Sequence, residues 1–170
     1  VYSSSSTNHS NEQNDDHVRG GGPPGGGVTA YPTGAPSSVC DDPFMEPTYH
    51  RDYLNATGYN NTNQYTLRSS PAEGRPGIVE VTLTGVPFKG FVVRASTPGE
   101  NNEGEFIVDE DSQFHALHCS SNENAAVTHS SPEFKSSVKL LWRDNNSGNH
   151  VFQATVVPTI ETYVINIFES

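Results

Sequence analysis

The residues of this chain best suited to chemistry are two cysteines, Cys40 and Cys119, and two histidines, His115 and His118, that lie next to the second cysteine. Imidazole and thiolate are ligands that zinc and copper prefer. In a strand, however, residues three apart point to opposite faces, as do direct neighbours. A single metal ion would need a bulge to contact both histidines, so the spacing favours structural histidines over a metal site.

The cysteines have two readings, which depend on the compartment. In an oxidising compartment Cys40 and Cys119 are expected to pair, because secreted proteins form disulfides readily. The bond would close a loop of about 80 residues, which the chain-entropy model values at roughly 4.5 kcal/mol. In the cytosol they would be two buried free thiols. A disulfide would leave no thiolate to act as a nucleophile.

Other catalytic and metal-binding patterns fail when their spacing is checked. The 170 residues contain no G-x-S-x-G motif, and nothing in the sequence marks the cleft that a pair of glycosidase carboxylates needs. Acidic residues crowd positions 100–111, where Asp109, Glu110 and Asp111 are weak calcium candidates. Counted from Asp109, the sixth position of an EF-hand would be Phe114 instead of glycine, so a solvated acidic loop is favoured. We therefore expect a protein that is not an enzyme and has no cofactor.

Length and charge narrow the classes of partner. The chain has 170 residues, with 9 basic and 20 acidic side chains and a formal net charge of -11. It is long enough for one domain with a tail, and its 15 glycines and 12 prolines exclude a long coiled coil. A chain this acidic has no general attraction to phosphate backbones or anionic lipids, which disfavours nucleic acid as a partner. No stretch reaches the roughly 18 apolar residues of a transmembrane segment.

Several features indicate a secreted glycoprotein. The sequence begins at Val1 and its only methionine is Met45, as expected if a secretory signal has been removed. Its N-x-S/T motifs predict N-linked glycans at four positions, Asn8, Asn55, Asn60 and Asn145. The predicted location is extracellular.

The chain has two unlike parts. Residues 1–38 are low in complexity, with a run of serines at 3–6 and GGGPPGGG at 20–27, and they form a predicted flexible N-terminal arm. The second part, 39–170, is the predicted domain. Extended at about 3.3 Å per residue, the arm could reach a neighbouring molecule and add a strand to an open sheet edge. The docking segment that we expect is formed by Val28, Thr29, Ala30 and Tyr31.

The domain has the period of β-strands. Apolar residues recur at every second position, as in Val81 and Leu83 or in Val138, Leu140 and Trp142, and we find no 3.6-residue pattern. The predicted strands cover nine runs: 65–68, 78–83, 88–95 (with Gly90 as a plausible bulge), 105–108, 114–119, 127–129, 138–143, 151–157 and 160–168. Such short strands predict a β-sandwich or a small barrel. The position of Trp142 argues against a true immunoglobulin domain, because Trp142 follows both cysteines, whereas the tryptophan of such a domain lies between them.

The order of several short motifs resembles the reeler domain family, found at the N-terminus of reelin and as stand-alone secreted proteins of invertebrates. The matching residues are YPTGAPSSVCDDPFMEP (31–47), PG (76–77) followed by VEVTL, FKGFVVRA (88–95), GEF (104–106), LHC (117–119), VTHSS (127–131), VKLLW (138–142) and VFQATVV (151–157). The resemblance implies an all-β, immunoglobulin-like sandwich of about eight or nine antiparallel strands, and it supports the pair Cys40–Cys119. It also implies that His129, in the motif VTHSS, is a hydrogen-bonded structural residue and not a catalytic one. The histidine that usually follows the family's Met-x-Pro element is displaced here, and His50 is the nearest.

Two functions follow as hypotheses. The first is a non-enzymatic adhesion or self-associating module, such as a filament or extracellular matrix subunit, that uses the arm and an unpaired terminal strand at 163–168 to bind other copies. The second, implied by the resemblance, is an innate-immune protein that binds microbial surfaces through bridging calcium or aromatic side chains. Those aromatic residues either bind or merely cover the rim of the sandwich: Phe44, Tyr49, Tyr53, Tyr59 and Tyr65. A role beside electron-transfer modules is disfavoured because we find no haem-ligand pair.

Overall fold

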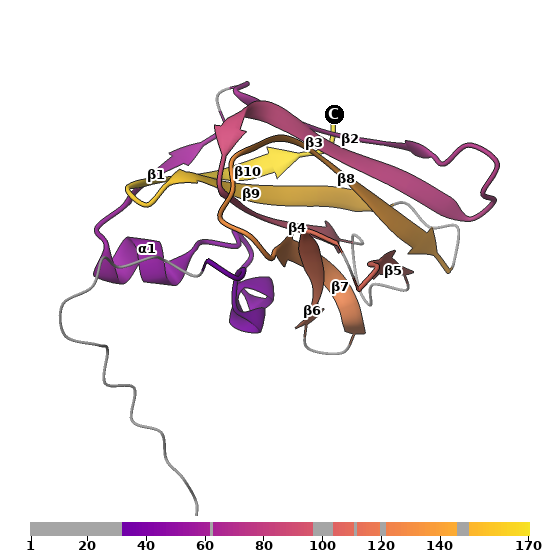
Figure 1. Ribbon diagram of the computed structural model, residues 1–170, viewed down its shortest axis with the longest axis horizontal. Helices are drawn as coiled ribbons and strands as arrows, with labels where there is room; N and C mark the ends of the chain where they lie inside the picture. The colour runs from indigo at the N-terminus through magenta and orange to yellow at the C-terminus, as the bar shows by residue number, and fades with distance from the viewer. Residues whose placement is uncertain (1–31, 62, 97–103, 111, 120–121, 146–149) are drawn as a thin grey trace, which may run out of the picture.

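The computed structural model describes residues 32–61, 63–96, 104–110, 112–119, 122–145 and 150–170 (Figure 1). Two short helices come first, η1 (Ser37–Asp41) and α1 (Thr48–Tyr53). The strands follow: β1 (Thr57–Asn60), β2 (Tyr65–Pro71), β3 (Ile78–Phe88), β4 (Gly90–Ser96), β5 (Gly104–Ile107), β6 (Phe114–Cys119), β7 (Asn122–His129), β8 (Lys135–Asp144), β9 (Val151–Thr159) and β10 (Thr162–Phe168).

The strands form two sheets packed face to face. One sheet has the order β1-β10-β9-β4-β7-β6, and the other has the order β2-β3-β8-β5. The prediction of an all-β sandwich is thereby confirmed. Nine of the ten strands described have antiparallel partners, whereas β1 pairs with β10 in parallel. The sequence analysis missed β1 because all four of its residues are exposed, which leaves no apolar alternation to detect.

The core between the sheets comes from the alternating residues. Val81 and Leu83 of β3 and Leu140 of β8 are at most 1% exposed, as the period of two predicts. Trp142 packs edge-on against Phe106, with ring centroids 4.8 Å apart. Inward residues of β4, β9 and β10 complete the same cluster from the six-stranded sheet.

Two local predictions were wrong. The last strand is not an unpaired edge, because β10 lies between β9 and β1, and the amide of Ser170 donates to the carbonyl of Leu67 at 3.2 Å. Gly90 is not a bulge, because it pairs in register with Val157. The irregularity lies earlier, between Thr84 and Phe88 in the pairing of β3 with β8. Pro87 falls in that stretch and has no amide hydrogen to donate to the ladder.

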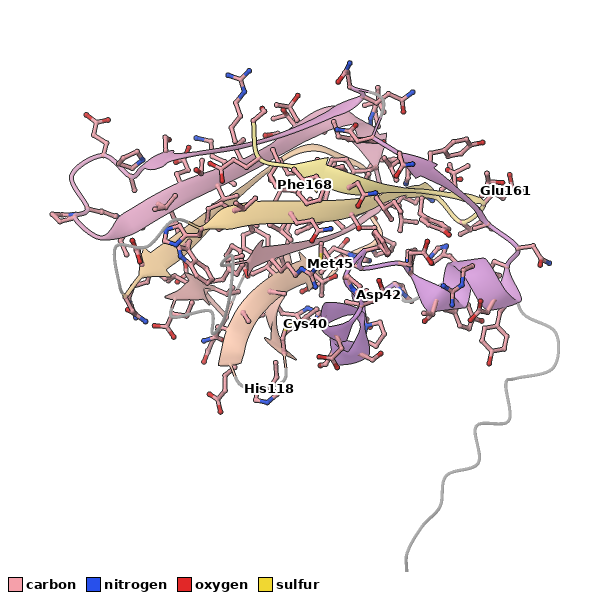
Figure 2. All side chains as sticks on the ribbon, turned by 180° about the vertical axis from the view of Figure 1, so that it is seen from behind. Cys40, Asp42, Met45, His118, Glu161 and Phe168 are labelled. Carbon is pink, nitrogen blue, oxygen red and sulfur yellow. A yellow bond between two sulfur atoms is a disulfide. The ribbon has the colours of Figure 1, made fainter. Side chains whose placement is uncertain are left out.

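A segment of little regular structure covers the outer face of the six-stranded sheet. We call residues 32–56 the cap segment; it contains η1 and α1 and lies beside β4, β7 and β9 (Figures 1 and 2). Val39 and Met45 pack there in a second apolar cluster with Val92 and Leu117. Residues 32–38, which composition assigned to the arm, belong to this packed segment. The rest of the arm, including residues 28–31, lies outside the described residues.

Candidate functional site: a pocket under the cap segment

The cap segment is bonded covalently to the sheet. Cys40 of η1 and Cys119 at the end of β6 form a disulfide, with Cα atoms 5.5 Å apart. The predicted pairing is therefore confirmed. Because β6 is the edge strand of its sheet, the bond ties the cap segment to that edge.

Arg94 of β4 holds the same stretch of backbone through hydrogen bonds. Its guanidinium donates to the carbonyls of Cys40 (2.8 Å), Asp42 (3.0 Å) and Pro43 (2.8 Å). It also donates to Oε1 of Gln153 at 2.8 Å. Burial lowers the pKa of Arg94, and the nearby Asp42 carboxylate opposes that shift. Sequence reasoning missed this role, although an arginine within the apolar run of β4 was a signal that its side chain had a partner.

The start of the cap segment requires a glycine. Gly34 has a φ of +113°, and a Cβ built on it would lie 2.5 Å from the carbonyl oxygen of His129. Neither the backbone angle nor the space permits a side chain there. The next residue, Ala35, donates its amide to Oγ1 of Thr128 at 3.0 Å. The chain thus passes close over β7 before η1 begins.

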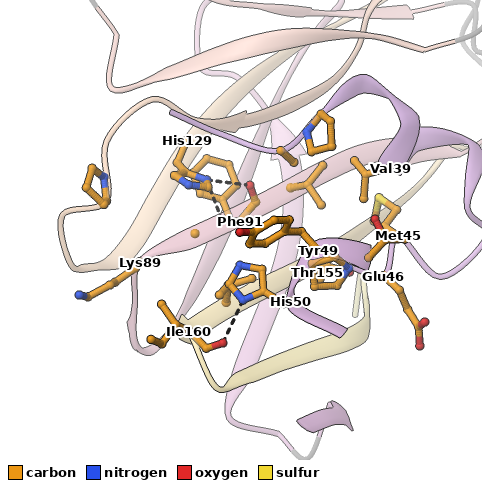
Figure 3. Close-up of a pocket in the computed structure, with 18 of the residues that line it drawn as sticks. Val39, Met45, Glu46, Tyr49, His50, Lys89, Phe91, His129, Thr155 and Ile160 are labelled. Carbon is orange, nitrogen blue, oxygen red and sulfur yellow. Dashed lines mark hydrogen bonds between the residues drawn. The ribbon is translucent and has the colours of Figure 1, made fainter. Parts of the chain in front are cut away.

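A pocket of about 130 Å³ lies between the two halves of the cap segment and the sheet (Figure 3). Its walls include Val39, Met45 and Tyr49 from the cap segment, and Val157 of β9 contributes to the sheet side. Lys89 also lines it and is exposed. The lining is mostly apolar, which is typical of pockets that bind small molecules.

His50 places a polar atom in this pocket. The residue is 6% exposed, and its Nδ1 lies 3.1 Å from the carbonyl oxygen of Ile160. A carbonyl only accepts, so Nδ1 carries the hydrogen. Burial lowers the pKa of His50 below its ordinary value of 6.5, and the bond to Ile160 opposes the shift. In the resulting neutral ring Nε2 has a free lone pair, and Figure 3 shows this atom directed into the pocket.

His50 should make the stability of the protein depend on pH. Between its lowered folded pKa and 6.5 the unfolded chain binds a proton that the folded chain does not, so the free energy of unfolding rises with pH. This stabilisation is complete above the unfolded pKa and is lost as pH falls toward the folded pKa. We expect His50→Gln to flatten the decline of the urea midpoint from about pH 7.5 to about pH 5. His118→Gln, at an exposed position, should leave the slope as in the wild type. Equal slopes for all three proteins would contradict the assignment.

His129 and His115 form hydrogen bonds, whereas His118 is exposed. The backbone amide of Phe91 donates to Nδ1 of His129 at 3.3 Å, as expected for a structural histidine. His115 shares a hydrogen bond of 3.0 Å with Oγ of Ser130, and His118 is exposed. Within the described ranges no group of three metal-ligating side chains occurs.

The predicted attachment and calcium residues are placed as follows. Asn55, Asn60 and Asn145 are exposed, and Asn55 follows α1 with a φ of 50°. Asp109 and Glu110 are also exposed. Three groups lie outside the described residues: Asn8, Asp111, and the docking segment Val28, Thr29, Ala30 and Tyr31.

The aromatic residues around the cap segment differ in exposure. Phe44 is 51% exposed, Tyr53 75% and Tyr59 51%, and we call these three the aromatic face. Tyr49 stacks on Tyr53 with ring centroids 5.2 Å apart. Tyr65 is only 2% exposed and packs against Phe88 in the core, so its proposed place on a binding surface was wrong.

Among the described helices none is long and apolar enough to span a membrane.

The molecule is thus a β-sandwich module with a disulfide-bonded cap segment and a mostly apolar pocket. The sequence model of the reeler domain family matches residues 40–170, and the chain belongs to that family. The match covers both cysteines and the whole sandwich.

Curated relatives are of two kinds. A protein of Antheraea mylitta named "Putative defense protein 3" is 33% identical over 147 residues, which span 82% of this chain and 83% of that protein. Ferric-chelate reductase 1 of Bos taurus is 36% identical over 119 residues, 61% of this chain but only 20% of the reductase. The chain thus matches about a fifth of the reductase's length.

Solved structures agree on the fold. The reeler domain of human F-spondin superimposes with a TM-score of 0.51 at 21% identity, covering 66% of this chain and 90% of that one.

Proposed function

We propose that this chain is a secreted, non-enzymatic defense module that adheres to microbial surfaces through its aromatic face. The observation that carries the proposal is the alignment with the Antheraea mylitta protein over 83% of that protein's length, so that the likeness covers most of a protein named for defense. The aromatic face supplies the contact surface, since exposed aromatic side chains offer large apolar area at low entropic cost.

The charge of the chain determines the kind of contact. With a net charge of -11, general attraction to anionic microbial polymers is weak. Flat rings on a rigid support can instead bury the apolar faces of sugars or lipids. Phe44 and Tyr53 belong to the cap segment, and Tyr59 to β1 beside α1 (Figure 1).

A pull-down on bacterial cells tests this function. We expect the wild type to be retained, and the triple variant Phe44→Ser, Tyr53→Ser, Tyr59→Ser to lose retention by about tenfold or more, since a few aromatic residues carry most of an interface's energy. The matched control is Phe134→Ser with Phe168→Ser, which removes exposed aromatic side chains elsewhere (64% and 51% exposed) and should bind as the wild type does.

Repeating the pull-down in the presence of a chelator distinguishes contact through the aromatic face from contact through bridging calcium. Retention should persist in chelator if the aromatic face makes the contact. Retention that chelator abolishes would assign the contact to calcium bridging at Asp109, Glu110 and Asp111 instead. No retention in either condition would refute adhesion to bacterial surfaces.

We also propose self-association through the arm, on the basis of a sheet edge at β6 that has no second strand neighbour in the described part of the chain. In the described part of the chain β6 has one strand neighbour, β7, which leaves its other edge without a strand partner. Gly34 lies against His115 of β6. Tyr31 is three residues away, about 10 Å of extended chain, so the segment 28–31 can reach the β6 edge of its own or another copy.

Size-exclusion chromatography compares the full chain with a truncated chain that lacks residues 1–31. We expect the full chain to form larger species at high concentration and the truncated chain to elute as a monomer. If both forms elute as monomers, filament and matrix assembly through the arm is refuted.

Glycan attachment is the remaining part of the proposal. Asn55, Asn60 and Asn145 are exposed, which leaves room for a glycan, and Asn8 has the same motif. Expression in a secreting eukaryotic host, followed by enzymatic deglycosylation, should lower the mass of the protein. An unchanged mass would refute glycosylation.

A further inference from the structure

We propose that the pocket under the cap segment binds one small hydroxylated apolar molecule, of the size of a phenol, whose hydroxyl donates a hydrogen bond to Nε2 of His50. None of the three residues of the aromatic face lines this pocket, and the proposal does not depend on adhesion to microbes. It rests on three properties of the pocket, namely its size, its mostly apolar lining and the position of Nε2 of His50.

The volume limits the ligand to a single ring or its equivalent. The pocket measures about 130 Å³. An engineered apolar cavity of about 150 Å³ in another protein admits benzene. A sugar chain or an extended lipid would be too large to enter as a whole, so the compatible class is a compact molecule of a few carbon atoms or one ring.

The lining selects an apolar body. Val39, Met45 and Val157 contribute aliphatic surface, and Tyr49 contributes an aromatic one. The hydroxyl of Thr155, which could otherwise compete for a polar ligand, is already bonded to the carbonyl of Phe44 at 3.3 Å. A ligand rich in hydrogen-bonding groups would leave them unsatisfied here.

Among the polar residues that line the pocket, His50 supplies a buried nitrogen that can still accept a hydrogen bond. Its Nδ1 is committed to the carbonyl of Ile160, and no described residue forms a hydrogen bond with its Nε2. The residue is 6% exposed, and Nε2 faces the pocket (Figure 3). A neutral imidazole nitrogen with a lone pair accepts a hydrogen bond and cannot donate one. The complementary group is therefore a hydroxyl donor, and a carboxylate would meet a lone pair.

The matched probes are p-cresol and toluene, which have the same ring and methyl group but differ by the hydroxyl. With the full chain at neutral pH, we expect p-cresol to bind about fivefold or more tightly than toluene, the factor that corresponds to one neutral hydrogen bond. Nitrogen-15 spectra of the histidine side chains should show a shift at Nε2 of His50 on addition of p-cresol. The signals of the exposed His118 should stay unchanged.

Two variants locate the site. Val157→Phe places a larger side chain in the pocket and should abolish binding of both probes. His50→Phe should remove the preference for p-cresol. Should this variant fail to fold, the nitrogen-15 shift in the wild type still tests the contact. Binding of neither probe, equal binding of the two, or binding that survives Val157→Phe would each overturn the proposal.

Discussion

The double variant Cys40→Ala, Cys119→Ala is expected to lose about 4.5 kcal/mol of unfolding free energy. The disulfide joins residues 79 apart in sequence, so its loss greatly increases the freedom of the unfolded chain. Replacing both cysteines leaves no stray thiol, and alanine fits the partly apolar surroundings of Cys40, which is 8% exposed. Urea unfolding followed by fluorescence of Trp142 measures the loss.

Reduction of the wild type supplies the control for this variant. Wild-type protein in excess reductant should lose a similar free energy of unfolding, because the same bond is absent without any substitution. The variant in reductant should change no further. A loss below about 1 kcal/mol in the variant would contradict the chain-entropy argument.

In addition to this global loss, the folded protein should become less ordered mainly in the cap segment. Residues 35–45 contribute few regular hydrogen bonds of their own, and the disulfide is one of their main attachments. Hydrogen exchange of the Val39 and Met45 amides should quicken in the variant more than exchange in β3 and β8. Uniform quickening across both sheets would mean that the bond acts only through global stability.

The parts of the fold that sequence predicted are those where burial follows a simple period. Val81 and Leu83 of β3 and Leu140 and Trp142 of β8 stand two positions apart in their strands, and all four are at most 1% exposed. Strand β1 showed no such period, since it is held by parallel pairing with β10 while its side chains face solvent.

The packing of the cap segment could not be predicted from the sequence, for a different reason. Met45 is fully buried, yet prolines and aspartates surround it and its φ of 50° belongs to a turn. Neither helical nor strand period can reveal burial of this kind, because the contacts depend on a chain path that tertiary anchors impose. Residues 32–38 also have a composition similar to that of the rest of the arm, so no change in composition marks the residue at which packing begins.

The pocket could not be predicted from any local sequence pattern. Its walls come from residues 32–50, 89–92, 129–132 and 155–160, which meet only after the disulfide and Arg94 fix the cap segment. His50 drew notice only as a displaced family histidine. Its role depends on the carbonyl of Ile160, which is 110 residues away.

Arg94→Ala is expected to lower the free energy of unfolding by about 3 kcal/mol, because it leaves three backbone carbonyls of the cap segment without their charged donor. Arg94→Lys should recover only part of the loss, since an ammonium lacks the planar fork that reaches several acceptors. Arg68→Ala is the matched control on β2, where the side chain is exposed and should matter by no more than about 0.5 kcal/mol. A loss from Arg94→Ala as small as the control's would show that the carbonyls find water instead.

The contributions of Arg94 and of the disulfide to the free energy of unfolding should also be coupled. Arg94 and the disulfide both hold the backbone at Cys40, so a chain that has lost one attachment has less ordered contact to lose with the other. Combining Arg94→Ala with the double cysteine variant should therefore cost less than the sum of the separate losses, by roughly 1 kcal/mol. An additive result would mean that the disulfide acts on the unfolded chain alone. In that case hydrogen exchange in the cap segment should respond to Arg94→Ala and not to loss of the bond.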